Sequence, residues 1–335
     1  MVQDNIKDII SKSVNSINYS NIDLKKVIEN INECLKQNQD LIISANQIDL
    51  KNNNGIKFDF TVTQRIFTDV LNEEQLYDKV ITSKKSDDKN IIYGKQISNI
   101  GNIVVVFDGN SYILLEMILK NILANNSVIF NCNNFMLGTN QILIQLIQKT
   151  LEELKLSKNQ FQLFISNSPR ILLSNFANID LIIAIGSHEL QRMVLKDSQS
   201  KIIVSGYEYF DIYIESKEHI DFIKTILKQT HYINLYINEN LNLTSPNAIM
   251  VSDVYEAITQ INFNGALNSA SIFTDNTSNA SKFIKGIKSN MITVNTSPTI
   301  ERKLNIEQKD LTVIKTVIYP VSYKFNSSKT EIEIS

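Results

Sequence analysis

Apolar residues in the first ninety positions recur at spacings of three and four, which places them on one face of a helix. The first stripe comprises Val2, Ile6, Ile9, Ile10, Val14 and Ile17, and the second comprises Leu24, Val27, Ile28, Ile31, Cys34 and Leu35. Ser20 and Asp23 precede the second stripe and are predicted to cap its helix. With a further helix over residues 61–83, this pattern predicts a helical N-terminal region that spans residues 1–90 and has Cys34 in its core.

From residue 91 the pattern changes to short β-branched runs that alternate with helical segments. Strands are predicted over residues 103–107, 127–131, 161–165, 181–185, 201–205 and 211–215, and helices over residues 111–124, 136–154, 170–175 and 188–196. Apolar strands separated by helices are typical of a parallel sheet that is covered on both faces. Right-handed crossovers between such strands predict a doubly wound, mostly parallel α/β domain over residues 91–230.

A second, shorter α/β pattern follows. Its predicted strands are residues 233–237, 248–251, 270–274 and 291–295, and its predicted helices are residues 219–230, 253–262 and 278–285. Ser252 is predicted to cap the middle helix. We expect a reduced second α/β domain over residues 231–295. A C-terminal arm is expected over residues 296–335, because the tail from Thr312 alternates like edge strands.

Composition and charge exclude several classes of partner. The chain has 335 residues, a hydrophobic fraction of 43% and a net charge of −2, with acids and bases mixed along its length. No basic stripe favours nucleic acid or an anionic membrane, and the longest apolar runs are too short to span a bilayer. The N-terminus lacks a signal pattern, so we expect a cytoplasmic protein that binds neither nucleic acid nor membrane. Two cysteines and three scattered histidines predict neither a disulfide framework nor a metal site.

Seven segments resemble segments of one enzyme superfamily, in the same order along the chain. Ile100-Gly-Asn-Ile-Val-Val-Val-Phe-Asp108 is similar to Leu-Gly-Val-Ile-Gly-Val-Ile-Tyr-Glu, and Asn178-Ile-Asp-Leu-Ile-Ile-Ala-Ile-Gly-Ser187 is similar to Tyr-Ile-Asp-Leu-Ile-Ile-Pro-Arg-Gly-Gly. The other segments are residues 41–50, 125–130, 211–214, 268–275 and 292–296. Together they resemble the aldehyde dehydrogenase superfamily, and most closely γ-glutamyl phosphate reductase, also called glutamate-5-semialdehyde dehydrogenase. The resemblance implies a helical N-terminal region, a nucleotide-binding α/β domain, a second α/β domain and an oligomerisation arm.

The resemblance also implies a catalytic cysteine, whose thiolate forms a covalent intermediate before hydride passes to or from a nicotinamide. The family's cysteine corresponds to the stretch of residues 222–238, where this chain has no cysteine. Residues 249–254 follow closely and resemble a segment that comes much later in the family, so the second domain is shortened. Cys132 follows a strand of the other domain, and we expect a structural or incidental role for it.

Other positions also lack residues that the family uses for catalysis or for cofactor binding. Tyr112 stands where the family has an amide that stabilises the oxyanion, and Asn110, two positions away, would serve only if the turn shifted. The resemblance places the cofactor, NADP or NAD, at Asn131 and at Gly186 and Ser187, although the neighbouring small or basic residues are lost. Gly186 and Ser187 suit a phosphate at a helix N-terminus, and they also suit a tight turn with a capping serine, which we favour.

We predict that the chain is a catalytically inactive superfamily member that acts as a binding or assembly module, with no catalytic residue. Two tyrosines in residues 205–210 are expected to fill space for substrate or nicotinamide. His231, Asp180 and Asp211 are interpreted as loop and turn residues. The alternative is an NAD(P)-dependent oxidoreductase that acts on a small aldehyde or acyl phosphate through a rearranged site. We also predict a homodimer through residues 323–335, because an unpaired edge strand is a liability.

Overall fold

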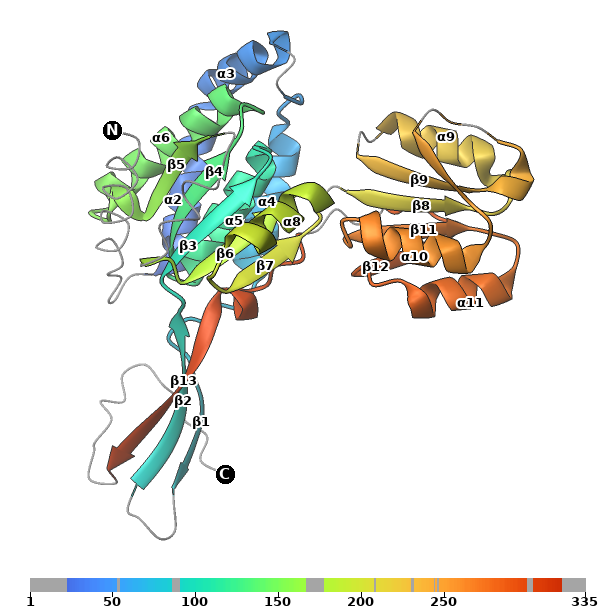
Figure 1. Cartoon of the computed structure of the whole chain (residues 1–335). Helices are drawn as coiled ribbons and strands as arrows, with labels where there is room; N and C mark the ends of the chain where they lie inside the picture. Colours follow the sequence, from blue (N-terminus) through green and yellow to red (C-terminus); the bar gives the residue numbers. More distant parts are fainter. Residues whose placement is uncertain are drawn as a thin grey trace. The chain divides into compact units, whose positions relative to one another are not determined.

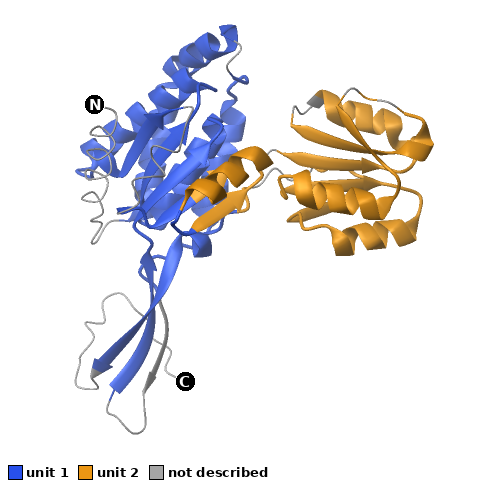
Figure 2. Cartoon of the chain, in the orientation of Figure 1, with its two compact units in different colours: residues 1–182, 199–201, 306–335 blue, residues 183–198, 202–305 orange. Residues whose placement is uncertain are grey.

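The computed structural model describes residues 23–52, 55–85, 91–166, 178–207, 209–229, 232–243, 245, 247–299 and 304–320. The chain divides into two compact units, one of residues 1–182, 199–201 and 306–335 and the other of residues 183–198 and 202–305 (Figure 2). The described residues contain one three-stranded sheet and two five-stranded sheets. None of their helices is long and apolar enough to cross a membrane.

Three helices open the described part of the chain (Figure 1): α2 (Leu24–Gln37), α3 (Gln39–Lys51) and α4 (Phe60–Asn72). The second predicted stripe forms the buried face of α2, except that Cys34 is only partly buried. Asp23, predicted as the capping-box partner of Ser20, is itself the cap, because its carboxylate accepts hydrogen bonds from the amides of Lys25 at 3.0 Å and Lys26 at 3.3 Å. Ser20 and the first predicted stripe lie outside the described residues.

α4 confirms the helix predicted over residues 61–83 as far as Asn72, whereas residues 80–85 form a strand, which corrects the end of that prediction. β1 (Val80–Lys85) pairs antiparallel with β2 (Ile91–Asn99), and β13 (Thr312–Pro320) pairs antiparallel with the other edge of β2. Thr312 lies opposite Asn99, more than two hundred positions earlier in the chain. Pairing with such distant residues decides the conformation, and the spacing of apolar residues within the segment does not reveal it.

The first five-stranded sheet has the strand order β5-β4-β3-β6-β7. Its strands are β3 (Asn102–Phe107), β4 (Ser127–Cys132), β5 (Phe161–Ile165), β6 (Leu181–Ile185) and β7 (Ile202–Ser205). The helices that connect them are α5 (Ser111–Leu123), α6 (Leu137–Glu153) and α8 (His188–Asp197). All residues of β3, β4 and β6 are buried, as expected for strands covered on both faces. The predicted α/β fold is confirmed, whereas the helix predicted over residues 170–175 lies outside the described residues.

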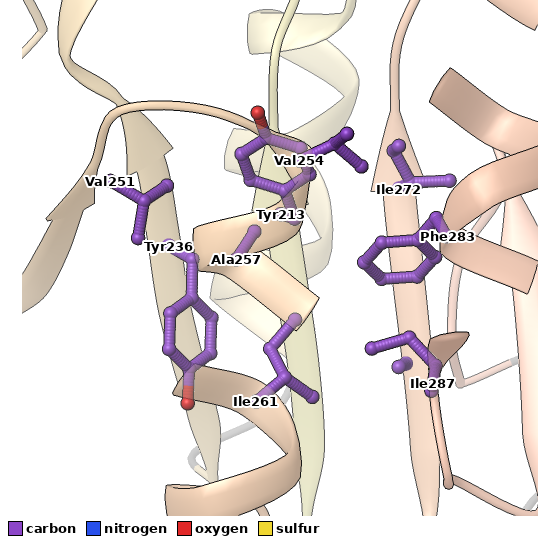
Figure 3. Close-up of a cluster of buried hydrophobic side chains, with 10 residues drawn as sticks. Tyr213, Tyr236, Val251, Val254, Ala257, Ile261, Ile272, Phe283 and Ile287 are labelled. Carbon is purple, nitrogen blue, oxygen red and sulfur yellow. The ribbon is translucent and has the colours of Figure 1, made fainter. Parts of the chain in front are cut away.

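The second five-stranded sheet has the order β10-β9-β8-β11-β12, and its neighbouring strands are all parallel. Its strands are β8 (Phe210–Ile214), β9 (Ile233–Asn238), β10 (Ala248–Val251), β11 (Ser269–Phe273) and β12 (Met291–Val294). Its helices are α9 (Ile220–Gln229), α10 (Val254–Asn264) and α11 (Thr277–Gly286). Alternate side chains of β8 point to opposite faces. Tyr213 packs in a core with Val254 and Phe283 (Figure 3), whereas Ile212 and Ile214 pack with α9.

The second domain begins earlier than the boundary predicted between residues 230 and 231. Phe210 of β8 lies opposite Ile233 of β9, and β8 also pairs with β11, so the second sheet includes residues from 210 onward. The apolar run of β8 resembles the strands before it, and only its pairing partners show the sheet to which it belongs.

The cap of α10 also differs from the prediction. The carboxylate of Asp253 accepts hydrogen bonds from the amides of Tyr255 at 2.8 Å and Glu256 at 2.9 Å, so Asp253 is the cap. Ser252, which the sequence predicted for that role, donates its hydroxyl to Glu256 at 2.6 Å. Both residues are typical of helix starts, and the backbone register decides between them.

Candidate functional site

Asn131, the first residue predicted to contact a cofactor, lies near the end of β4 and is 2% exposed. Its side-chain amide donates to the carbonyl oxygens of Phe164 at 3.2 Å and Ser166 at 3.4 Å. These bonds tie the carboxyl end of β4 to that of β5. The amide donors of Asn131 are therefore engaged within the fold.

Cys132 follows Asn131 and is 1% exposed. Burial, with a smaller contribution from the Asp108 carboxylate, raises the pKa of its thiol to about 12. Only about one thiol in 10⁵ is then ionised at pH 7, and the thiol is a poor nucleophile without ionisation. Cys132 thus behaves as a small buried apolar residue, in agreement with the structural role predicted for it.

The N-terminus of α6 directly follows the turn after β4. The carboxylate of Asp49, from α3, accepts hydrogen bonds from the amides of Gly138 at 2.9 Å and Thr139 at 2.8 Å, and from the Thr139 hydroxyl at 2.6 Å. A helix N-terminus favours an anion because its first amides lack partners within the helix. Here the anion is a carboxylate of the protein itself, so the position is closed to a phosphate.

Gly186 and Ser187 form the turn between β6 and α8. The Ser187 hydroxyl accepts from the amide of Leu190 at 3.2 Å, which confirms the predicted capping serine. Gly186 has a φ of +149°, and a Cβ at this position would lie 2.9 Å from a methyl group of Leu190. The carbonyl oxygen of Gly186 accepts from the Gln191 side chain at 3.0 Å. This turn is tight and internally bonded.

Tyr112, at the position of the family's oxyanion donor, holds the chain that leads into α4. Its hydroxyl accepts from the amide of Asp59 at 2.6 Å, and its ring stacks on Phe58 at a centroid distance of 5.2 Å. Asn110 caps α5 by accepting from the amide of Tyr112 at 2.9 Å. Both residues have structural roles in the first unit.

The sequence predicts that Tyr207 and Tyr209 fill space for substrate or nicotinamide. Tyr207 is buried, and the ring of Tyr209 lies 4.9 Å from that of Tyr232. A Cβ on Gly206 would lie 2.2 Å from the carbonyl oxygen of Ala266. The two tyrosines and the close backbone approach leave little room beside this turn.

Two aspartates that the sequence left without a catalytic role are structural in different ways. Asp180 accepts from the amide of Asn102 at 2.8 Å. Asp211 is fully buried at the start of β8, where Asn234 donates to it at 2.9 Å. Burial raises the pKa of Asp211 to about 7. Nearby, burial together with the Asp211 carboxylate also raises the pKa of Tyr236. His231 lies outside the described residues.

A cavity of about 720 Å³ in the second unit was not predicted from the sequence. Its lining includes Glu215, Ser216 and Lys217 after β8, and Thr274, Asp275 and Asn276 after β11. Polar residues directly after two apolar strands were the available signal, because the carboxyl ends of parallel strands share one edge of a sheet. The signal requires knowing that β8 and β11 are neighbours, which the sequence did not give.

No protein-family model matches this chain. The γ-glutamyl phosphate reductase of Brachyspira hyodysenteriae is 24% identical over 352 residues, which cover 83% of this chain and 81% of that protein. The structure of the γ-glutamyl phosphate reductase from Thermotoga maritima matches with a TM-score of 0.67 at 16% identity, over 95% of this chain and 99% of that one. Aldehyde dehydrogenase 21 from Physcomitrella patens matches with a TM-score of 0.68 at 13% identity, over 96% of this chain and 91% of that one.

The chain has the fold of the aldehyde dehydrogenase superfamily. Within the superfamily, the curated relatives that it matches are γ-glutamyl phosphate reductases. The chain spans about half the length of several of them, 52% of one and 53% of another.

An aldehyde dehydrogenase is expected to hold a nicotinamide dinucleotide, and the described residues do not fit one. Hydrogen-bonding groups at the carboxyl end of the first sheet are engaged within the protein. Asn131 donates to a carbonyl oxygen of β5, and Asp49 and Ser187 accept from amides of α6 and α8. The methyl group of Leu190 covers Gly186. Among the described residues, no group of three His, Cys, Asp or Glu side chains is arranged to hold a metal ion.

Proposed function

We propose that this chain is a catalytically inactive member of the aldehyde dehydrogenase superfamily that acts in the cytoplasm as a binding or assembly module. The observation that carries the proposal is the absence of a cysteine from residues 222–238. The chain has two cysteines, Cys34 in α2 and Cys132 at the end of β4. Burial raises the pKa of Cys132 to about 12, which argues against its taking over as the nucleophile.

The turns that would bind the cofactor support the same proposal. Asn131 and Ser187 each form hydrogen bonds with neighbouring backbone groups. The Asp49 carboxylate accepts from α6 amides that would otherwise be available to a phosphate. A rearrangement of several separate contacts would be required to admit a dinucleotide. Tyr112 likewise binds backbone where an oxyanion donor is expected.

The assembly part of the proposal concerns the three-stranded sheet. Tyr93 of β2 and Ile314 and Ile318 of β13 have exposed apolar side chains. Exposed apolar side chains on a short sheet favour pairing with a second copy of the chain. We expect a homodimer in which residues 323–335 take part. A sedimentation coefficient that stays unchanged after deletion of residues 324–335 would count against this dimer.

An active oxidoreductase is the second candidate, and its support is the similarity to γ-glutamyl phosphate reductase over 83% of the chain. The deciding experiment is an assay with NADPH and an acyl phosphate, and with NADP⁺ and a semialdehyde. We expect no turnover above the rate without protein. Turnover that is lost in Cys132→Ala would show instead that this thiol serves a rearranged site.

A further inference from the structure

The strand order of the second sheet creates a crevice. From β8 the chain runs outward through β9 to β10, and then crosses back to place β11 on the other side of β8. α9, which follows β8, packs on one face of the sheet, whereas α11, which follows β11, packs on the opposite face (Figure 1). The loops after β8 and β11 therefore diverge. In doubly wound sheets, ligands bind at such a point, outside the carboxyl ends of the strands.

The cavity of about 720 Å³ lies at this divergence, and its volume is within the range of sites for small molecules. Its lining is polar except for Leu241. The superfamily's cysteine corresponds to residues 222–238, and none of these residues lines the cavity. The cavity is therefore separate from the position of the catalytic cysteine.

Hydroxyl and amide donors in the cavity hold two carboxylates in place. Thr274 Oγ1 donates to one oxygen of Glu215, and Asn279 Nδ2 donates to the other at 2.7 Å. The Ser216 hydroxyl donates to Asp275, whose side chain is 55% exposed. A carboxylate oxygen accepts more than one hydrogen bond, so both groups keep acceptor capacity toward the cavity.

We propose that this cavity binds a small organic molecule that carries a primary ammonium group. An ammonium brings three donors and one positive charge, which complement the remaining acceptors and the two negative charges of Glu215 and Asp275. Lys217 also lines the cavity and brings one positive charge, so Glu215 and Asp275 leave the lining with a net negative charge. Two further titratable groups contact the carboxylates: His219, with Nε2 at 3.6 Å from Asp275 Oδ1, and Tyr213, whose hydroxyl donates to Glu215 Oε1 at 3.5 Å.

Anionic ligands are disfavoured by the same contacts. A phosphate or carboxylate would meet Glu215 and Asp275 at close range. The amides of Ser278 and Asn279, at the start of α11, already donate to Asn276 at 3.0 and 3.2 Å. The proposal does not depend on the loss of catalysis, because the cavity uses none of the residues that correspond to the superfamily's active site.

Calorimetric titration of the full chain with 1,4-diaminobutane tests this proposal. We expect saturable binding to one site per chain, and none with 1,4-butanediol or inorganic phosphate. Asp275→Asn should weaken binding by about tenfold, because one charged acceptor is lost. The matched control is Asp221→Asn, which removes the same charge from a side chain that is 96% exposed on α9 and does not line the cavity.

A second variant keeps the proposal testable if Asp275→Asn changes the conformation of the loop. Thr277→Lys places an ammonium at the exposed rim of the cavity and should abolish binding of the diamine. Absence of saturable binding, or equal weakening by Asp221→Asn and Asp275→Asn, would overturn the proposal. Equal binding of 1,4-butanediol would also overturn it and would indicate a site for uncharged polyols.

Discussion

The two five-stranded sheets share one strand order, yet their carboxyl ends have different chemistry. At the ends of the first sheet, Asn131, Ser187 and the α6 amides bond to the protein itself. At the ends of the second sheet, polar side chains line an open cavity. A doubly wound order therefore creates the position of a binding site, and the hydrogen bonds that the protein leaves available decide whether a ligand has a place there.

The largest effect is expected from Asp49→Ala, which removes the carboxylate that closes the first sheet's end. Asp49 is buried and accepts three hydrogen bonds, so the free energy of unfolding should fall by about 4 kcal/mol in urea denaturation. Asp49→Asn retains an acceptor and should lose less. If Asp49 takes the place of an anion, inorganic phosphate should restore part of the stability of Asp49→Ala. No restoration would contradict this closure.

A pH dependence is expected from Asp211, at the opposite end of β8 from the cavity. Burial raises its pKa to about 7 in the folded chain, against about 4 in the unfolded chain. The folded state thus keeps a proton that the unfolded state releases. The free energy of unfolding should therefore fall by about 3 kcal/mol as the pH rises from 4 to 8.

Two variants show whether the pH dependence of stability comes from the buried Asp211 or from the cavity. Asp211→Asn should remove the decline between pH 4 and 8, whereas Asp275→Asn, whose carboxylate is half exposed, should preserve it. Chemical denaturation at a series of pH values measures both. A decline that persists in Asp211→Asn would assign it to another group.

The smallest effect is expected from Tyr112→Phe. The ring can still stack on Phe58, whereas the hydroxyl loses its hydrogen bond from the Asp59 amide and its 3.5 Å bond to the Lys57 carbonyl oxygen, so the free energy of unfolding should fall by about 1 kcal/mol. Tyr255→Phe is the control, because Tyr255 is 59% exposed, and thermal denaturation should show no change for it. A gain of cofactor binding in Tyr112→Phe would instead mean that this hydroxyl blocks a working site.

Local patterns in the sequence predicted the elements that local forces decide. Apolar runs predicted the buried strands β3, β4 and β6, and a serine before a helix predicted the cap at Ser187. Features that join distant positions were not predictable in this way. β1 depends on β2, which also pairs with residues 312–320 at its other edge, and Asp49 bonds to residues about ninety positions later.

The cavity shows the same limit. Glu215 and Thr274 are bonded across 59 positions, and their meeting depends on the chain crossing back over β8. The sequence showed polar residues at the ends of both strands, but it did not give the strand order that makes them neighbours. The closure of α6 by Asp49 was missed for the same physical reason, because neither partner is unusual in its own segment.

Calorimetric titration with NADPH and NADH tests most directly the claim that the end of the first sheet is closed. We expect no saturable heat for either dinucleotide, because Asn131, Ser187 and the α6 amides are bonded within the protein. Tight binding with one dinucleotide per chain would contradict it.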